Sequence, residues 1–339
     1  MVTLWLIAIL AMLSVAVSHH LSVELRLVKY HIAQAQAAAL ARGGVRYGIE
    51  LLRLEQKDDQ PAHDWLGDDW AIRPEANGSE EDPAAIAMTV PTEIAGREAA
   101  VTVWIRDEER TVDVNRAIDP FGEYVLQRLV GAEVVPPIAD YIDEDSTPRD
   151  PGGVEEQLQA TPAYRAKNNR IVAREELAAI PGITPQILER LRTLTSPFPK
   201  DPPGRLNVNT TGIDVLRAVF DASGNPSLAG LADKLVEFRW DPGDGDPATG
   251  ARFTQLSPAI TVLPATTPVD DGLAKSLAEA MLNGSLKDLL SAASDRFVVT
   301  VTAASGESGP AYRIEAVIDR GAVGTTRPTI LSWREGGVS

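Results

Sequence analysis

The sequence predicts an α+β protein in which a long N-terminal helix packs on an antiparallel sheet, with a large all-α subdomain inserted between strands. Three observations support this fold class. The first 54 residues have the pattern of one long helix. Segments with period-two alternation and many β-branched residues lie before residue 115 and after residue 295, while the block between them has helical spacing. Because insertions are tolerated at exposed sheet loops, one sheet interrupted by a helical subdomain is the most economical arrangement.

The N-terminal stretch combines two kinds of helix. Residues 2–23 carry no charged side chain when the histidines are neutral, and their length is close to what a helix needs to cross a bilayer. Apolar residues then recur at spacings of four and three, the stripe of an amphipathic helix. They are Leu21, Leu25, Val28, Ile32, Ala35 and Ala39. At ~1.5 Å per residue the whole rod would be on the order of 80 Å long, and we expect its stripe, from about Leu25 to Leu54, to pack on the sheet.

Two other interpretations of this stretch stay open. A cleaved secretory signal would use Ala16-Val17-Ser18 as its small-residue site, although no basic region precedes the apolar run and the helical stripe continues past it. A single-span anchor followed by a linker is the second, because an apolar run alone does not show what it packs against. The adjacent Gly43 and Gly44 predict a kink or the end of the helix.

The strands of the sheet come from both ends of the head. We expect a hairpin of residues 99–106 and 111–114, and further strands at 297–303, 312–320 and 329–333. The predicted domains are the membrane half of the helix at 1–23, its amphipathic half at 24–55, the head at 56–115 and 295–339, and the inserted helical domain at 116–294. Within that domain, helices are predicted at 123–130, 173–180, 184–192, 212–220, 227–238 and 272–293.

Composition removes several function classes. The formal net charge of −16 argues against binding to nucleic acid, whose phosphates would be repelled. Cysteine is absent, which excludes disulfides, thiolate metal sites and cysteine nucleophiles. The last of the four histidines is His63, so the main body lacks the usual general base and the commonest zinc ligand. We therefore expect a protein that is not an enzyme.

Three motifs have both a structural and a functional interpretation. The segments VDVNRA at 112–117 and LNVNTT at 206–211 each place an asparagine before a helical stretch, which predicts an N-cap more strongly than a ligand site. Residues 177–188 predict a helix, a Pro-Gly-Ile turn and a second helix, as in helix-hairpin-helix DNA-binding modules, although such modules usually add basic residues.

Residues 140–156 gather seven carboxylates in a Pro/Gly-rich loop. The spacing is not that of an EF-hand, so a solvated loop is favoured over a calcium site, and 241–246 is a weaker candidate of the same kind.

These pieces, in this order, resemble the K-type minor pseudopilin of the type II (general) secretion pathway. They are VTLWLIAILAMLSVAV, RDEERTVDVNRA, IADYIDEDSTPRDPGGVEE, TPAYRAKNNRIVAREELAAIPGIT, RLNVNTT and LSWREG, and together they extend over nearly the whole chain. The resemblance implies a pilin-like fold and a structural role at the tip of a periplasmic pseudopilus, where the protein helps to initiate assembly and export across the outer membrane. It implies a single-pass protein of the inner membrane with its head in the periplasm. The implied partners are other minor pseudopilins in a tip complex, the inner-membrane secretion platform and exported proteins.

The resemblance also implies calcium as a bound ion in the acidic loop. By position it assigns the ligands to Asp143, Asp145, Glu155 and Glu156. No basic leader ending in Gly precedes Met1, so we expect a start codon placed too late or a trimmed sequence, and the acidic residue that most pseudopilins carry near mature position five is absent, as is usual for the K-type. The alternative function is a membrane-anchored DNA-binding protein that uses the helix-hairpin-helix module, whereas an anchored hydrolase has almost no residues to support it.

Overall fold

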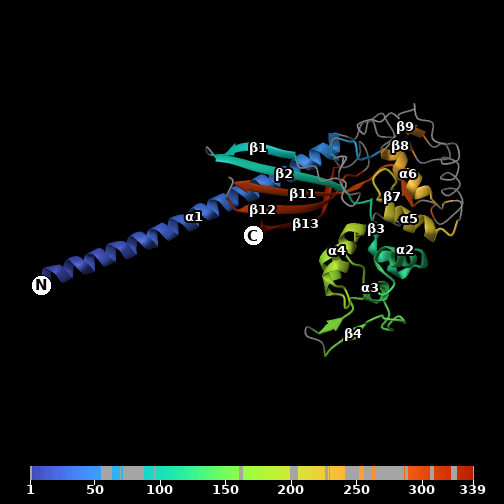
Figure 1. Ribbon diagram of the computed structural model, residues 1–339, viewed down its shortest axis with the longest axis horizontal. Helices are drawn as coiled ribbons and strands as arrows, with labels where there is room; N and C mark the ends of the chain where they lie inside the picture. The colour runs from blue at the N-terminus through green and yellow to red at the C-terminus, as the bar shows by residue number, and fades with distance from the viewer. Residues whose placement is uncertain are drawn as a thin grey trace.

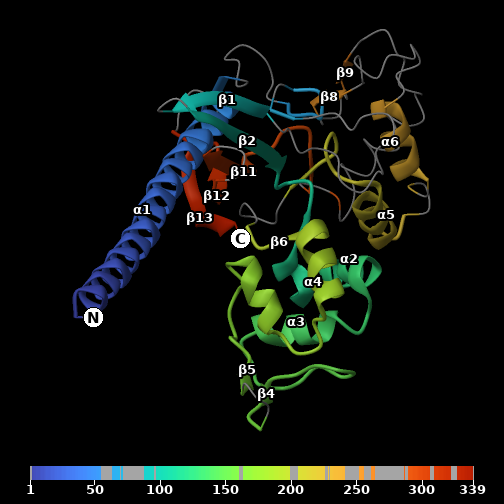
Figure 2. The same cartoon turned by 60° about the vertical axis from the view of Figure 1, so that its left-hand side comes forward.

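In this computed structural model a long rod carries a head at one end (Figure 1). The 339-residue chain is described at residues 2–54, 63–68, 70–71, 88–94, 97–159, 163–198, 205–225, 228, 230–240, 252–255, 261–263, 286, 289–305, 309–321 and 327–338. The rod is helix α1 (Val2–Leu54), a single uninterrupted helix whose C-terminal part lies along the sheet of the head (Figures 1 and 2).

The main sheet of the described residues is antiparallel and has five strands in the order β1-β2-β11-β12-β13. They are β1 (Met88–Ile94), β2 (Arg97–Asp107), β11 (Arg296–Ser305), β12 (Ala311–Asp319) and β13 (Thr329–Val338). The last three confirm the strands predicted at the C-terminal end, and the long helix on an antiparallel sheet confirms the α+β fold class. Strand β1 was not predicted, because Pro91 interrupts its pattern, and it lies at the sheet edge, where proline is tolerated.

The face of α1 that meets the sheet consists mainly of small residues. The buried residues of the helix are Ala33, Ala37, Ala41, Gly44, Val45, Gly48 and Leu52. A Cβ on Gly44 would lie 2.6 Å from Cγ1 of Val301, and one on Gly48 would lie 2.8 Å from Cγ1 of Val299. Glycine therefore lets the helix axis approach the valine-rich sheet more closely than a larger residue would. The two glycines do not end the helix, as one interpretation expected, because Gly44 is held against the sheet and the helix continues to Leu54.

The predicted contact between the apolar stripe and the sheet is wrong. Every residue from Val2 to Ile32 is exposed, and so are Ala35 and Ala39 farther along. At 100° per residue, this stripe lies on the opposite side of α1 from the buried alanines and glycines. Stripe spacing alone did not distinguish the two faces, because alanine occurs on both.

The predicted hairpin of 99–106 with 111–114 is also wrong. Strand β2 is flanked by β1 and β11, whereas β3 (Val112–Asp113) pairs in parallel with β6 (Thr195–Ser196). The chain turns out of the sheet directly after β2, where Oδ1 of Asp107 accepts the backbone N–H of Glu109 and the carbonyl of Glu108 accepts that of Thr111. These buried hydrogen bonds form a turn after β2, so the chain continues into the helical part of the head and does not pair with β2 as a hairpin.

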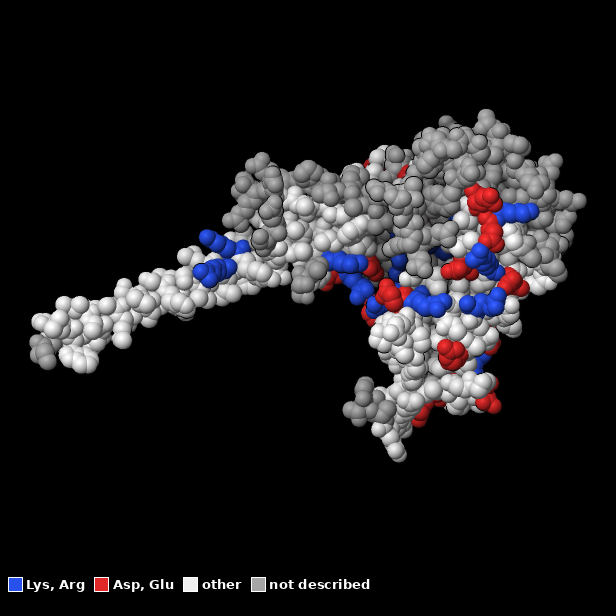
Figure 3. Space-filling view, in the orientation of Figure 1, with Lys and Arg blue, Asp and Glu red and all other residues white. Residues whose placement is uncertain are grey.

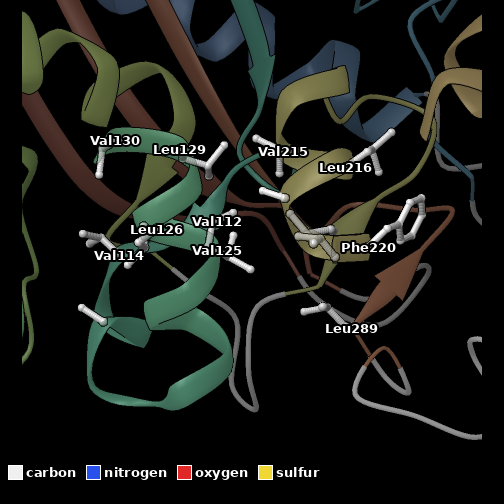
Figure 4. Close-up of a cluster of buried hydrophobic side chains, with 14 of the residues drawn as sticks. Val112, Val114, Val125, Leu126, Leu129, Val130, Val215, Leu216, Phe220 and Leu289 are labelled. Carbon is white, nitrogen blue, oxygen red and sulfur yellow. The ribbon is translucent and has the colours of Figure 1, made fainter. Parts of the chain in front are cut away.

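The helical block lies between β2 and β11 in the chain and has its own core. Its helices in the described residues are η1 (Val114–Ile118), α2 (Pro120–Val130), α3 (Val135–Ile142), η2 (Arg174–Ala179), α4 (Pro185–Leu194), α5 (Ile213–Ala222) and α6 (Leu231–Trp240). Its short strands, besides β3 and β6, are β4 (Glu156–Gln157), β5 (Tyr164–Arg165), β7 (Leu206–Asn207), β8 (Arg252–Gln255), β9 (Thr261–Leu263) and β10 (Leu290–Ser291). Figure 4 shows side chains of α2 and α5 in this core, together with Leu289.

Capping residues explain where helix α2 begins and ends. Helix α2 begins where Oδ1 of Asp119 accepts the N–H of Gly122, with Pro120 in the first turn, and it ends at Gly131, whose φ is 108°. The helices predicted at 123–130, 184–192 and 212–220 are confirmed, and 227–238 overlaps α6.

Three details of the helix prediction differ from the structure. The segment 173–180 forms the 3₁₀ helix η2, and α3 was not predicted. The end of the segment 272–293 is wrong, because Leu290 and Ser291 form β10 against β7; residues 272–285 lie outside the described part.

Candidate functional site

An acidic cluster forms where α3 ends. Asp143 is the C-cap residue of α3, and its N–H donates to the carbonyl of Ala139. The chain then makes a loop and returns at β4, which places Glu155 next to the end of the helix. One carboxylate oxygen from each of Asp143, Asp145 and Glu155 lies within 4.8 Å of the other two. The structure therefore brings together three of the four residues that the resemblance assigned to calcium.

The cluster has free ligand atoms. Glu155 is only 6% exposed, yet its Oε1 atom has no hydrogen-bond partner, and neither does the buried Oδ1 atom of Asp143. Burial raises the pKa of Glu155, and the neighbouring carboxylates Asp140, Asp143 and Asp145 raise it further. Calcium binds carboxylate oxygens at about 2.3–2.6 Å, so three oxygens at this separation fit around one ion. The unpartnered buried oxygens of Asp143 and Glu155, beside the exposed carboxylate of Asp145, are thus suited to a hard cation.

Glu156 does not join this group. It lies in β4, where it pairs with Arg165 of β5, and one of its carboxylate oxygens is 2.9 Å from Nε of that arginine. Glu155 precedes β4 and its carboxylate lies beside those of Asp143 and Asp145, whereas the carboxylate of Glu156 pairs with Arg165, so Glu156 lies outside the cluster. The weaker candidate loop at 241–246 lies outside the described residues.

The two asparagine motifs form matching backbone clamps instead of helix caps. Asn115 exchanges two hydrogen bonds with the backbone of Ile171, accepting its N–H at 2.7 Å and donating to its carbonyl at 3.1 Å. Asn209 does the same with Phe253, at 2.8 and 2.9 Å. The N-cap prediction for both is wrong, because a buried amide with one donor and one acceptor can pair with an extended backbone residue as a strand neighbour would. The shared pattern of VDVN at 112–115 and LNVN at 206–209 was the signal for this common role.

A buried polar group joins the sheet to the helical block. Oδ2 of Asp107 accepts hydrogen bonds from the hydroxyls of Thr210, at 2.5 Å, and Ser294, at 2.6 Å. Asn207 donates to the same oxygen, and Asp64 makes a buried ion pair with Arg320 at 2.7 Å. Burial raises the pKa of Asp107 to about 6, even though these donors lower it. The group is closed to solvent and contains no histidine. Its arrangement is therefore suited to holding the sheet and the helical block together.

A second junction involves the Pro-Gly-Ile hairpin. Arg174 of η2 forms a buried ion pair with Glu108, which also accepts the hydroxyl of Ser196. The other arginines of this hairpin are also engaged: Arg190 donates to the carbonyl of Leu129, and Arg192 faces Glu189 at 4.0 Å. Phosphate binding would require cations that point outward, whereas Arg174 and Arg190 bond within the head and the partly exposed Arg192 faces a carboxylate.

The exposed part of α1 contains the candidate membrane segment. It is the one helix in the described residues that is long and apolar enough to cross a bilayer by length and composition, and none of its most apolar window is buried. The outer part of the rod shows no charged side chain in Figure 3, whereas charges gather on the head. This arrangement fits a single-pass membrane anchor.

Comparisons with known proteins agree with this architecture. Residues 114–200 match the family model for "Type II secretion system (T2SS), protein K". The structure is similar to a chain in the crystal structure of the GspK-GspI-GspJ complex from the enterotoxigenic Escherichia coli type 2 secretion system, with a TM-score of 0.58 and 17% sequence identity over 91% of this chain and 99% of that chain. No curated protein matches the sequence. The chain therefore has the fold of that secretion-system protein, and its residues 114–200 match the protein K family model, which confirms the resemblance to K-type minor pseudopilins.

Proposed function

We propose that this chain is the minor pseudopilin at the tip of a type II secretion pseudopilus, where it helps to initiate assembly and export. It is anchored in the inner membrane by α1 and holds its head in the periplasm. Its partners are other minor pseudopilins, the secretion platform and exported proteins. The proposal rests on the protein K domain and on the uncovered apolar stripe of α1.

The stripe carries the argument for assembly. Leu25, Val28 and Ile32 are each more than half exposed, although they lie beyond the uncharged segment at 2–23. The same face continues through Ala35 and Ala39, which lie beside the sheet and remain exposed. An apolar face of this length that the head leaves uncovered would be costly in water. Lateral packing against the helix of another pseudopilin would cover it both inside and outside the membrane.

The absence of cysteine makes this packing testable. Val28→Cys would place a unique thiol on the stripe, and Tyr30→Cys would place one at nearly the same height but about 200° around the helix. In membranes that contain the other pseudopilins of the same system, a short thiol-to-amine crosslinker should join the Val28→Cys chain to another pseudopilin. The Tyr30→Cys chain is the matched control, since both positions are more than half exposed. Equal crosslinking at both positions, or none at either, would contradict packing through the stripe.

We further propose that Asp143, Asp145 and Glu155 bind one calcium ion. Bound calcium would supply the positive charge that offsets the three carboxylates, while the remaining ligands would come from backbone carbonyls or water. The support is the convergence of the three oxygens and the unpartnered buried atoms of Asp143 and Glu155.

Thermal melting tests the calcium proposal. Calcium should raise the melting temperature of the chain in detergent relative to chelator, by an amount that corresponds to about 2.7 kcal/mol at a hundredfold excess over Kd. Magnesium should have a much smaller effect, because it requires a tight octahedron. Asp145→Ala and Glu155→Ala should abolish the calcium effect, whereas Glu144→Ala, an exposed neighbour outside the cluster, should preserve it. An equal rise with magnesium would favour a solvated acidic loop.

We also infer that the head has no catalytic site. The buried Asp107, Thr210 and Ser294 group is the nearest approach to a catalytic arrangement in the described residues, and it has neither a histidine nor access to solvent. Hydrolytic activity of the purified chain that disappears in Ser294→Ala would contradict this.

A further inference from the structure

Arg149 lies beside the acidic cluster without being one of its ligands. Its Nε atom is 3.3 Å from Oδ2 of Asp143 and 3.9 Å from Oδ1 of Asp140, and one of its terminal nitrogens is 3.9 Å from Oε2 of Glu123. It is thus a fixed cation next to a group of carboxylates. A cation in this place could act in two opposite ways, by repelling a metal ion or by orienting a ligand.

The contacts of Asp143 distinguish these two roles. Its Oδ2 atom accepts a hydrogen bond from Nε of Arg149, whereas its buried Oδ1 atom has no partner. A carboxylate held by one oxygen presents the other in a fixed direction. The arginine therefore restricts the rotation of the Asp143 side chain, while one oxygen stays free for a ligand.

The position of Arg149 is itself fixed by a buried acid. Asp140, in the last turn of α3, is fully buried, and its carboxylate accepts the backbone N–H of Arg149 at 3.2 Å. The N–H of Val154 also interacts with this carboxylate. Gly153 passes so close to Asp140 that a Cβ there would overlap the carboxylate oxygen. Asp140 therefore holds both Arg149 and the residue before Glu155, which links the two sides of the cluster.

We propose that Arg149, held by Asp140, is a positioning residue of the calcium site: it binds Oδ2 of Asp143 and so directs Oδ1 toward the ion. This inference rests on the calcium site proposed above. It assigns a function to an arginine whose positive charge, by repulsion alone, would weaken the binding of calcium. Partners that orient a metal ligand typically contribute a factor of about 10 to 100 to metal affinity.

The two roles predict opposite effects of one substitution. If Arg149 positions Asp143, Arg149→Gln should weaken calcium binding by roughly tenfold or more. If it only repels the ion, the same substitution should strengthen binding. Arg165→Gln is the matched control, because it removes a nearby positive charge that pairs with Glu156, outside the cluster. It should leave the affinity unchanged or slightly increase it. Arg149→Lys, which keeps the charge but replaces the planar donor group, should lie between wild type and Arg149→Gln.

Isothermal titration calorimetry of calcium into the full chain in detergent would measure these affinities, with far-UV circular dichroism and melting in chelator to show that each variant is folded. A Kd for Arg149→Gln that is equal to or lower than that of wild type would overturn the inference while leaving the calcium proposal intact. An Arg149→Gln chain that does not fold would be replaced by Arg149→Lys, whose Kd must then exceed that of wild type; an equal Kd would overturn the inference. If wild type does not bind calcium, both proposals fail.

Discussion

Substitution of the two adjacent glycines of α1 should have opposite effects on stability. In a helix interior, glycine is less favourable than alanine by roughly 0.5–1 kcal/mol, so Gly43→Ala should stabilise the protein, because nothing lies within 4 Å of its added Cβ. Gly44→Ala gains the same helix term, but its Cβ would lie 2.6 Å from Cγ1 of Val301 and 3.0 Å from Cγ1 of Val101. Both valines are buried in the sheet core, so their movement requires repacking. Overpacking of this kind typically costs about 1–3 kcal/mol.

The difference between the two variants isolates the contact between helix and sheet, because the helix-propensity term is common to both. With about 2–4 °C per kcal/mol for a protein of this size, Gly44→Ala should melt roughly 2–12 °C below Gly43→Ala. Thermal unfolding of the full chain in a mild detergent, followed by tryptophan fluorescence, would measure the difference in melting temperature between the two variants. Trp70 is a suitable probe, since it is buried and its ring packs edge-on against Phe297 in the same core. Equal melting temperatures would show that α1 does not approach the sheet this closely, and would refute the argument from small residues.

Three further predictions concern the head. Removal of residues 1–23 should leave a soluble, folded head, since residues 2–23 are all exposed and contribute nothing to either core; a chain that is recovered only as aggregate would contradict this. Burial raises the folded-state pKa of Asp107 to about 6 from its ordinary value of 3.8, so the stabilising contribution of this carboxyl is complete below pH 4 and is lost as the pH rises through 6, by about 3 kcal/mol. Melting temperatures from pH 4 to 7 should therefore rise in Asp107→Asn relative to wild type, and a constant difference would refute the assignment. Asn209→Ala should destabilise the fold by about 2–4 kcal/mol in urea unfolding, because it leaves both backbone groups of Phe253 without their side-chain partner, whereas the exposed Asn169→Ala should change stability by less than about 0.5 kcal/mol.

Much of the fold followed from local patterns. The uncharged run at 2–23, the period-two alternation of β2, β11 and β12, and the helical spacing of α2 and α4 depend on neighbours in the sequence, which is why they were predicted correctly. The order of these pieces also led to the resemblance that the family comparison confirmed. In the site, the crowding of carboxylates at 140–156 was visible directly, and three of the four assigned ligands are close together in space.

The long-range features were decided by tertiary structure. Leu25 and Ala33 both lie on apolar faces of α1, and only the close approach of the sheet determines that the face of Ala33 is buried. Residues 112–113 have the pattern of a strand, but their partner is β6, more than eighty residues away, because the buried bonds of Asp107 and Glu108 turn the chain out of the sheet. Glu155 and Glu156 are adjacent carboxylates in the sequence, yet the fold places Glu155 beside Asp143 and pairs Glu156 with Arg165 of β5. The sequence by itself determined which segments are apolar, helical or extended, whereas pairing and facing depend on contacts between residues far apart in the chain, which the local pattern does not encode.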